Sequence, residues 1–163
     1  MTSATQDVCQ EVWWDTLVVG NDHAGLELVG TLATWFEQHF PGHSWLHLGT
    51  HSLDSTDYPR WASSVAAEVK KNVRTCGLLI CGSGQGMAMA ANRHPNVRAA
   101  LGYDSTSVRL ARLHNHANVL CLGARLLGTE TANDCLFTFL STPAGLEERH
   151  TRRVAEIDSQ LMA

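Results

Sequence analysis

The chain has 163 residues, of which 44% are hydrophobic, and this length suits one well-buried domain and is short for two. The net charge of -4 and the pI near 6.1 argue against a nucleic-acid surface, and no run of Lys and Arg could follow a phosphate backbone. No window is apolar enough to span a bilayer, and the first residues have neither the basic start nor the apolar centre of a signal peptide. We therefore expect a soluble, cytoplasmic protein that binds neither nucleic acid nor membrane.

The first half of the chain predicts two strands and two helices after an extension. Residues 1–14 are expected to be a loose N-terminal extension, and residues 15–163 a single domain. Thr16–Gly20 is an apolar, β-branched strand, and the polar turn Asn-Asp-His-Ala-Gly follows it. A helical pattern of apolar residues then ends at Pro41-Gly42. Trp45–Leu48 is a second strand, and Pro59 suits the first turn of the next helix.

The second half continues the alternation. Gly77–Arg93 reads as a buried strand, a tight glycine loop and a helix. Val97–Leu101 and Val119–Leu122 are further strands, with a helix over Ser105–Leu113 between them. One more helix buries apolar residues around Cys135, and a last one carries several arginines. Five apolar strands alternating with helices predict an α/β fold, a three-layer αβα sandwich around a doubly wound, Rossmann-like parallel sheet.

In such folds ligands bind beyond the carboxyl ends of the strands. We therefore expect Asp22, His23, Cys81, Ser83 and the loop after Leu101 to face one crevice.

Cys81 is the strongest candidate for chemistry among the five cysteines. An odd cysteine count with three thiols in apolar segments suits reduced thiols, and packing is the expected role of Cys76, Cys121 and Cys135. Cys81 instead leads directly into the glycine loop, where backbone N–H groups favour a thiolate. The loop presents these donors, together with the Ser83 hydroxyl, to an oxygen that becomes negatively charged.

Met87 argues against two well-known phosphate-binding loops. A dinucleotide-binding fingerprint needs its third glycine where this chain has Met87, and it belongs to the first strand–helix unit. A low-molecular-weight tyrosine phosphatase needs an arginine at the same place.

The other polar candidates each have a simpler structural explanation. Asp22 and His23 could cap the following helix, which is compatible with a functional role. His114 can act as an acid or base near neutral pH, whereas His116 is expected to be a solvated loop side chain. The spacing of these two histidines is a weak zinc signal, and we predict no metal. Arg149 and Arg153 share a helix face and could hold a phosphate, although the neighbouring Glu147 and Glu148 are also consistent with an ordinary solvated helix.

Taken together, these residues resemble the type B ribose-5-phosphate isomerases and their relatives that act on galactose 6-phosphate and allose 6-phosphate. The resemblance spans about Leu17 to Ile157. The matching pieces, in family order, are Gly20–Gly25, Thr56–Pro59, Cys81–Gly86, Ala90–Arg93, Val97–Ala100, His114–Val119, Leu122–Arg125 and Glu147–Arg153. No single piece would suffice, but together they are highly specific.

The resemblance implies aldose–ketose isomerisation through an enediolate, without a metal or other cofactor. It makes Cys81 the base that moves a proton between C1 and C2, and His114, helped by Asp22, the group that opens the furanose ring. Ser83 and the loop amides would hold the enediolate oxygen. The implied substrate-binding residues are His23, Tyr58, Gly82, Gly84, Gln85, Gly86, Asn115, Arg125, Arg149 and Arg153. Of these, His23, Arg149 and Arg153 would bind the phosphate, with Arg125 a further candidate.

The resemblance also implies a homodimer with shared sites, or a tetramer built from such dimers. The C-terminal helix would pack on a partner subunit, and the partner would supply His114, Asn115 and Arg125. One branch of the family uses a glutamate base where this chain has Met87, so this chain fits the cysteine branch.

We expect D-ribose 5-phosphate as the substrate, with D-ribulose 5-phosphate as the product. The alternatives are a hexose 6-phosphate (allose or galactose) isomerase and a non-catalytic module that binds a sugar phosphate or a nucleotide. Retention of both Cys81 and His114 favours an enzyme, since binding alone requires neither.

Overall fold

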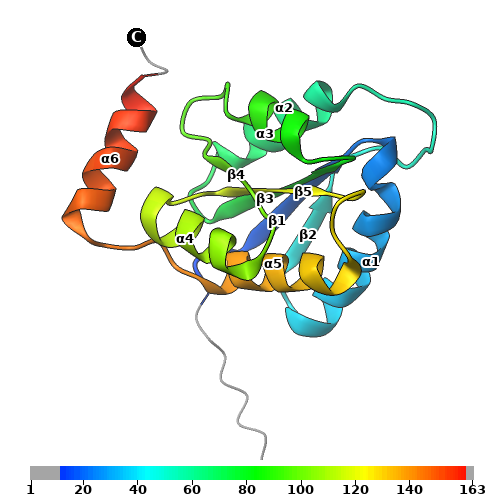
Figure 1. The fold of residues 1–163 in the computed structure, drawn as a ribbon, viewed down its shortest axis with the longest axis horizontal. Coiled ribbons are helices and arrows are strands. Elements are labelled where there is room, and N and C mark those ends of the chain that lie inside the picture. Colours follow the sequence, from blue (N-terminus) through cyan, green and yellow to red (C-terminus); the bar gives the residue numbers. More distant parts are fainter. Residues whose placement is uncertain (1–11, 161–163) are drawn as a thin grey trace, which may run out of the picture.

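The computed structural model describes residues 12–160 and has a parallel sheet between two layers of helices (Figure 1). The five strands are β1 (Thr16–Asn21), β2 (Ser44–His47), β3 (Thr75–Cys81), β4 (Ala99–Leu101) and β5 (Val119–Gly123). Their order across the sheet is β2-β1-β3-β5-β4, and every neighbouring pair is parallel. The doubly wound α/β fold predicted from the strand–helix alternation is confirmed.

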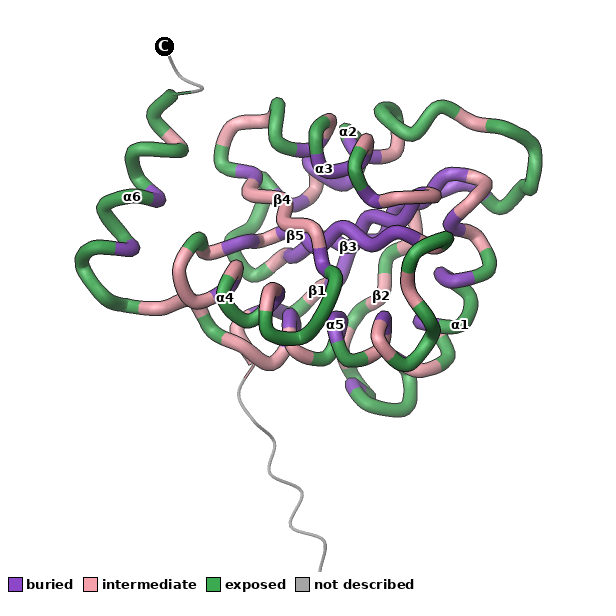
Figure 2. Tube along the Cα trace, viewed as in Figure 1, coloured by how far each residue is buried: buried purple, intermediate pink, exposed green. Residues whose placement is uncertain are grey.

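The helices divide between the two faces of the sheet. α1 (Leu26–His39), α4 (Ser105–Asn115) and α5 (Thr129–Ser141) cover one face, and α2 (Tyr58–Val69) and α3 (Gln85–Ala91) cover the other. A short 3-10 turn, η1 (His23–Gly25), joins β1 to α1. Successive residues of β3 alternate between the layers, so that Ile80 packs in the first core and Cys81 in the second. β5 is buried throughout, and β3 is buried at every position after Thr75 (Figure 2).

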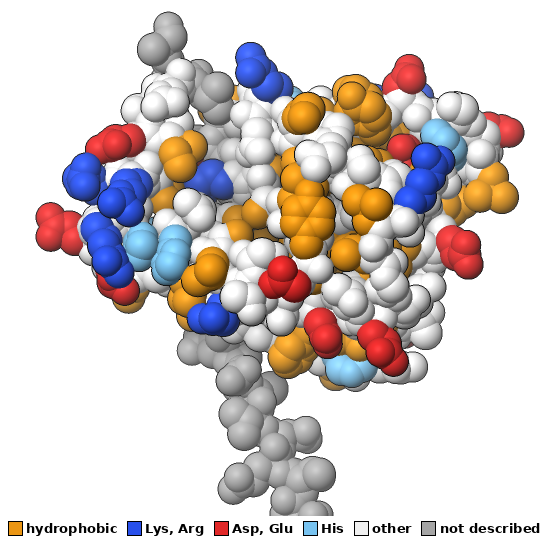
Figure 3. Space-filling model, in the orientation of Figure 1, with side chains coloured by type: hydrophobic (Ala, Val, Ile, Leu, Met, Phe, Trp, Pro, Cys, Tyr) orange, Lys and Arg blue, Asp and Glu red, His pale blue; other side chains and the backbone are white. Residues whose placement is uncertain are grey.

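The last helix, α6 (Glu148–Ser159), stands at the end of the molecule away from the carboxyl ends of the strands (Figure 1). Within the chain it packs mainly on α4, and its buried residues are His150 and Val154. Near its far end, Asp158 forms a two-pronged ion pair with Arg98, with both N–O distances 2.9 Å. Its exposed arginines contribute to the basic surface at this end of the molecule (Figure 3).

The expectation of a loose segment up to Trp14 is wrong for its last residues. Trp14 is completely buried, and its indole Nε1 donates to the Leu140 carbonyl at 3.0 Å. Trp13 packs edge-on against Phe139 and lies over the Arg112 guanidinium, 3.5 Å from the ring centroid. Burial of two large aromatic rings outweighs the polar character of the flanking sequence, so the domain begins before Trp14. Residues 1–11 of the expected extension lie outside the described residues.

Three cysteines have the packing role that we expected. Cys76, Cys121 and Cys135 are buried in the sheet and α5. Burial raises the pKa of all three thiols above the usual value, so they remain protonated near neutral pH. Their chemistry is therefore that of small apolar side chains.

Candidate active site

The strand order reverses between β1 and β3, which makes this the topological switch point of the sheet. The helix after β1 covers one face and the helix after β3 covers the other, so the two connections diverge there. The carboxyl ends of these strands carry Asp22 and Cys81, respectively. Crevices at such switch points are the usual ligand sites of open α/β sheets. Asp22 and Cys81, which we expected to face one crevice, therefore both lie at this switch point.

At this point the glycine loop wraps around the Cys81 sulfur. The Gly84 amide donates a hydrogen bond to Cys81 Sγ at 3.1 Å, and the thiol is 5% exposed. Gly84 adopts a φ of +78°, a backbone conformation that favours glycine and turns its N–H toward the sulfur. The loop therefore fixes the position of the Cys81 sulfur at the carboxyl end of β3.

The Ser83 hydroxyl is oriented by the same loop. Its oxygen accepts from the Gln85 amide at 3.3 Å, which leaves the hydroxyl proton free to donate outward. We expected all the amides of Gly82–Gly86 to hold a substrate oxygen. In this chain the amides of Gly84 and Gln85 are already used by the thiol and the serine.

Asp22 and His23 are both held by backbone contacts. Asp22 is buried, and its Oδ1 accepts from the amides of Ala24 and Gly25 at 3.0 and 3.2 Å, so it does cap the turn. His23 Nδ1 accepts from the Thr56 amide at 3.2 Å. This bond puts the proton of a neutral imidazole on Nε2, which makes that nitrogen the donor available to a ligand.

Tyr58 closes one side of the glycine loop. It begins α2 and is 40% exposed, and its ring lies directly against Gly86. A Cβ at position 86 would lie 2.6 Å from Tyr58 Cζ, so only glycine leaves room for the ring. On the other side, Gln85 Nε2 donates to the Tyr103 hydroxyl at 2.9 Å. Tyr103 had no role in the sequence analysis, although it lies in the loop after Leu101 that we expected at the crevice.

Arg125 belongs to the Cys81 group of its own chain. The amides of Ala124 and Arg125 donate to the carbonyls of Cys81 and Gly82 at 2.9 and 3.0 Å. A Cβ at position 82 would lie 3.3 Å from Arg125 Nη1, so the guanidinium lies over the start of the loop. The expectation that a partner supplies Arg125 therefore differs from this geometry, because the β5–α5 connection delivers it in cis.

A second group of predicted residues lies at the opposite edge of the sheet, where the strands begin. His114 and Asn115 end α4, beside the start of β5, whereas Cys81 pairs with Gly123 at the end of β5. Four residue steps along β5 separate these edges by about 13 Å. Arg149 and Arg153 lie on α6, next to His114 rather than Cys81. One chain therefore does not bring its two groups together.

Within this second group, two histidines stack face to face. The rings of His114 and His150 have centroids 4.3 Å apart and are inclined by only 12°. Burial of His150 and the nearby His114 lower the pKa of His150. His150 was not among the residues predicted for the site. A signal was available, since His150 and Val154 are four residues apart and define the inward face of an otherwise polar helix.

His116 is part of the structure rather than a solvated side chain. It caps α4 with a positive φ of 49°, and its Nε2 lies 2.7 Å from the Gly145 carbonyl. This contact fixes the connection between α5 and α6. Our assignment of His116 to a non-catalytic role fits this position, but the expected solvent exposure was wrong because the ring is half-buried.

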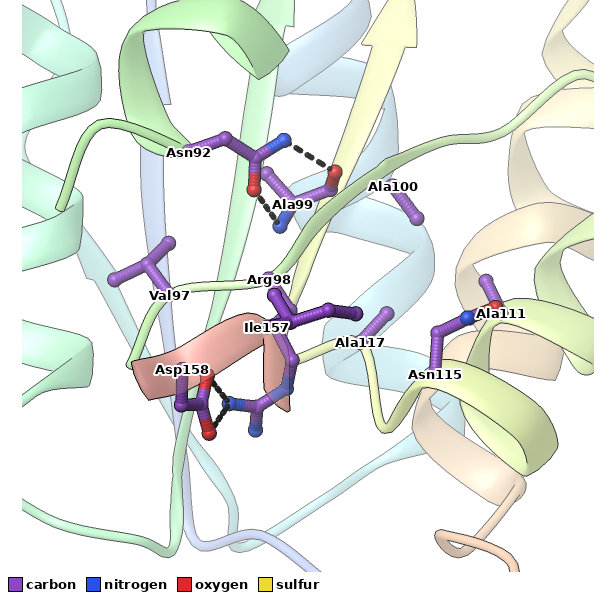
Figure 4. Close-up of a pocket in the computed structure, with 10 residues that line it drawn as sticks. All are labelled: Asn92, Val97, Arg98, Ala99, Ala100, Ala111, Asn115, Ala117, Ile157 and Asp158. Carbon is purple, nitrogen blue, oxygen red and sulfur yellow. Dashed lines mark hydrogen bonds and ion pairs between the residues drawn. The ribbon is translucent and has the colours of Figure 1, made fainter. Parts of the chain in front are cut away.

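A cavity of about 410 Å³ adjoins the second group, between β4, α4 and α6 (Figure 4). Asn115 and Ile157 line it. At its rim, the Asn92 side chain accepts from the Ala99 amide and donates to the Ala99 carbonyl at 2.8 and 2.9 Å (Figure 4). These bonds occupy polar groups on the open edge of β4 and leave a mostly apolar hollow.

Residues 12–160 contain neither a metal-binding cluster nor a membrane-spanning helix. No three His, Cys, Asp or Glu side chains gather in this range in a way that could hold a metal ion. Among the same residues, no helix is long and apolar enough to cross a membrane.

Comparison with known proteins identifies the family. Residues 17–157 match the family model described as Ribose/Galactose Isomerase. This chain belongs to the ribose/galactose isomerase family. It is therefore an isomerase enzyme that acts on a sugar phosphate.

Individual relatives cover nearly the whole length of this isomerase. The probable ribose-5-phosphate isomerase B of Mycoplasma pneumoniae is 38% identical over 86% of this chain and 91% of its own. Ribose-5-phosphate isomerase B of Escherichia coli is 36% identical over 86% and 93%. The structure of the type B ribose 5-phosphate isomerase of Trypanosoma brucei is 37% identical, with a TM-score of 0.86 over 90% of this chain and 99% of that one.

Proposed function

We propose that this isomerase interconverts D-ribose 5-phosphate and D-ribulose 5-phosphate without a metal, through ring opening and an enediolate, with Cys81 as the base. The observation that carries the proposal is the Gly84 amide directed at Cys81 Sγ at the switch point of the sheet. A thiolate placed there can remove a carbon-bound proton, and a binding module would need no such group. The names of the relatives support ribose 5-phosphate as the substrate.

The proposed reaction moves protons within the substrate, with no net gain or loss of a proton. Cys81 removes the proton from C2 of the open-chain aldose, and the electrons of that C–H bond form the C1–C2 double bond of the enediolate. The Ser83 hydroxyl donates to the oxygen that gains charge. A proton then moves from O2 to O1 while the Cys81 thiol returns its proton to C1, which gives the ketose. His114, with Asp22, moves the proton that opens the ring, and Tyr58 borders the sugar beside Gly86.

The phosphate is bound by His23, Arg149 and Arg153, with Arg125 beside the loop as a further cation. His23 offers its Nε2–H, because Thr56 holds Nδ1. Arg149 and Arg153 are exposed on the first half of α6, and Arg149 now pairs with Glu147 at 2.7 Å. Binding of a phosphate dianion would compete with that exposed ion pair, which is itself worth little.

The complete site forms between two copies of the chain. Asp22, His23, Tyr58, Cys81 and Arg125 come from one copy, while His114, Asn115, Arg149 and Arg153 come from the other. The distance between the two edges of the sheet supports this arrangement, as does the packing of α6 on α4. The smallest active unit is then a homodimer, and a tetramer would contain two such units.

The test is turnover of ribose 5-phosphate, with allose 6-phosphate and galactose 6-phosphate in parallel and a chelator present. We expect chelator-resistant conversion of the pentose, and turnover of a hexose phosphate alone would refute the substrate. Cys81→Ala should lower turnover by about a hundredfold or more. Cys121→Ala is the matched control, because it removes a buried thiol from the same core. Equal losses in both variants would refute the role of Cys81.

A further inference from the structure

The His114–His150 stack joins α4 to α6. His150 is the buried residue in the first turn of α6. The His150 side chain is 7% exposed, and its Nε2 has no hydrogen-bond partner among the described residues. The nearest carboxylate, on Glu147, lies 3.8 Å away and is itself exposed. A buried nitrogen in this position cannot contact a substrate directly. What His150 does offer is the flat face of its ring, 4.3 Å from His114.

The charges around His150 favour its neutral form. Burial is the first cause that lowers its pKa, followed by His114, and Arg149 and Arg153 act in the same direction. Glu147 alone acts in the opposite direction. His150 therefore presents the face of a ring whose neutral form is favoured to the imidazole of His114.

The position of the His150 ring is fixed because α6 is held near both of its ends. His150 lies in the first turn, and Asp158 in the last turn is held by Arg98. Arg98 is in turn tied to the end of α4, because its Nε donates to the His116 carbonyl at 3.1 Å. The ring of His150 thus has a defined position relative to the helix that carries His114.

We propose that His150 is a positioning residue for ring opening: its ring holds the imidazole of His114 in the orientation from which His114 reaches the furanose oxygen. This inference rests on the proposed function. It assigns His150 to the ring-opening step alone, because His150 stacks on His114, whereas the proton transfer between C1 and C2 uses Cys81.

The two steps can be measured separately because of the chemistry of the substrates. Ribose 5-phosphate closes a furanose ring and must be opened before it reacts. Ribulose 5-phosphate has its ketone at C2 and its O5 phosphorylated, so it cannot close that ring. Exchange of a C1 hydrogen of ribulose 5-phosphate with deuterated water therefore reports proton transfer without ring opening. Conversion of ribose 5-phosphate reports both.

The variants are His150→Ala, which removes the stack, and His150→Phe, which keeps an aromatic face without a titrating group. We expect His150→Ala to slow conversion of ribose 5-phosphate by about tenfold, as a misplaced catalytic group does, and to leave exchange within about twofold of the wild type. His150→Phe should restore conversion to within about threefold. Val154→Ala, which removes the other buried contact of α6, should leave the ratio of the two rates unchanged.

Each other outcome overturns the inference. Equal losses of conversion and exchange in His150→Ala would indicate a packing role. Loss in His150→Phe as large as in His150→Ala would show that the stacked face does not matter, and no loss in either would show that the stack has no role. The proposed function fails separately, if the wild-type enzyme does not convert ribose 5-phosphate at all.

Discussion

If the site is shared between subunits, two inactive variants should restore each other. Cys81→Ala and His114→Ala each disable one half of the site, and the halves lie at edges of the sheet about 13 Å apart. In a heterodimer of the two variants, one site combines the intact Cys81 of one chain with the intact His114 of the other. The second site has neither. The heterodimer should therefore have about half of the wild-type activity, while both parent homodimers are inactive.

The assay is co-expression with two different affinity tags, isolation of the heterodimer and measurement of ribose 5-phosphate conversion. A heterodimer as inactive as its parents would refute the shared site. The matched control places both substitutions on one chain and pairs it with a wild-type chain. Each shared site then lacks one residue, so this heterodimer should be inactive. A site built within one chain would reverse both results, with about half activity in the control and none in the first pair.

Three further predictions concern the fold and the loop. Trp14→Ala should lower the free energy of unfolding by about 3–5 kcal/mol, measured by urea denaturation, because it empties a fully buried indole site; a loss near zero would contradict its place in the core. Gly86→Ala should raise KM by displacing the Tyr58 ring, and should add little to the effect of Tyr58→Ala in the double variant; additive effects would refute this coupling. Burial, the larger cause, and His51 lower the pKa of His47 below its ordinary 6.5. The unfolded chain therefore binds more protons than the folded chain, and the free energy of unfolding should fall as pH drops from about 7.5 to about 5.5. His47→Gln, which can still donate to Asn21, should flatten that dependence, and an unchanged slope in denaturation measured across this range would contradict it.

The strands β1, β3 and β5 could be predicted because strands buried on both faces read as continuous apolar runs. The exact ends of the strands could not be predicted. Val97 was expected to begin β4, but its amide bonds to the His94 carbonyl in a turn, and Asn96 has a positive φ of 63°. The Asn118 side chain then accepts from the Arg98 amide, where a strand neighbour would have done so. A side chain that replaces a ladder bond leaves no trace in hydrophobic periodicity.

That Asp22 and Cys81 lie near each other could be predicted from the sequence for a related reason. In parallel sheets the residues after each strand lie at one edge, so Asp22 and Cys81 had to approach each other. The stack of His114 on His150 could not be derived in this way, because it depends on how α6 returns to α4 after the connection at residues 142–147. The embedding of Trp13 and Trp14 depends likewise on a groove formed by distant helices.

The candidate residues around His114 lie in a less stable part of the fold than those around Cys81. α6 has only two buried side chains and is held by a ring stack near its start and an ion pair near its end. A helix with so few buried apolar contacts opens at a lower free energy than the strands that carry Cys81. A partner that covers α6 and the cavity beside β4 would raise the free energy needed to open α6. If the proposed dimer forms, dilution of the enzyme should reduce ring opening through loss of that dimer, while the fold around Cys81 stays intact.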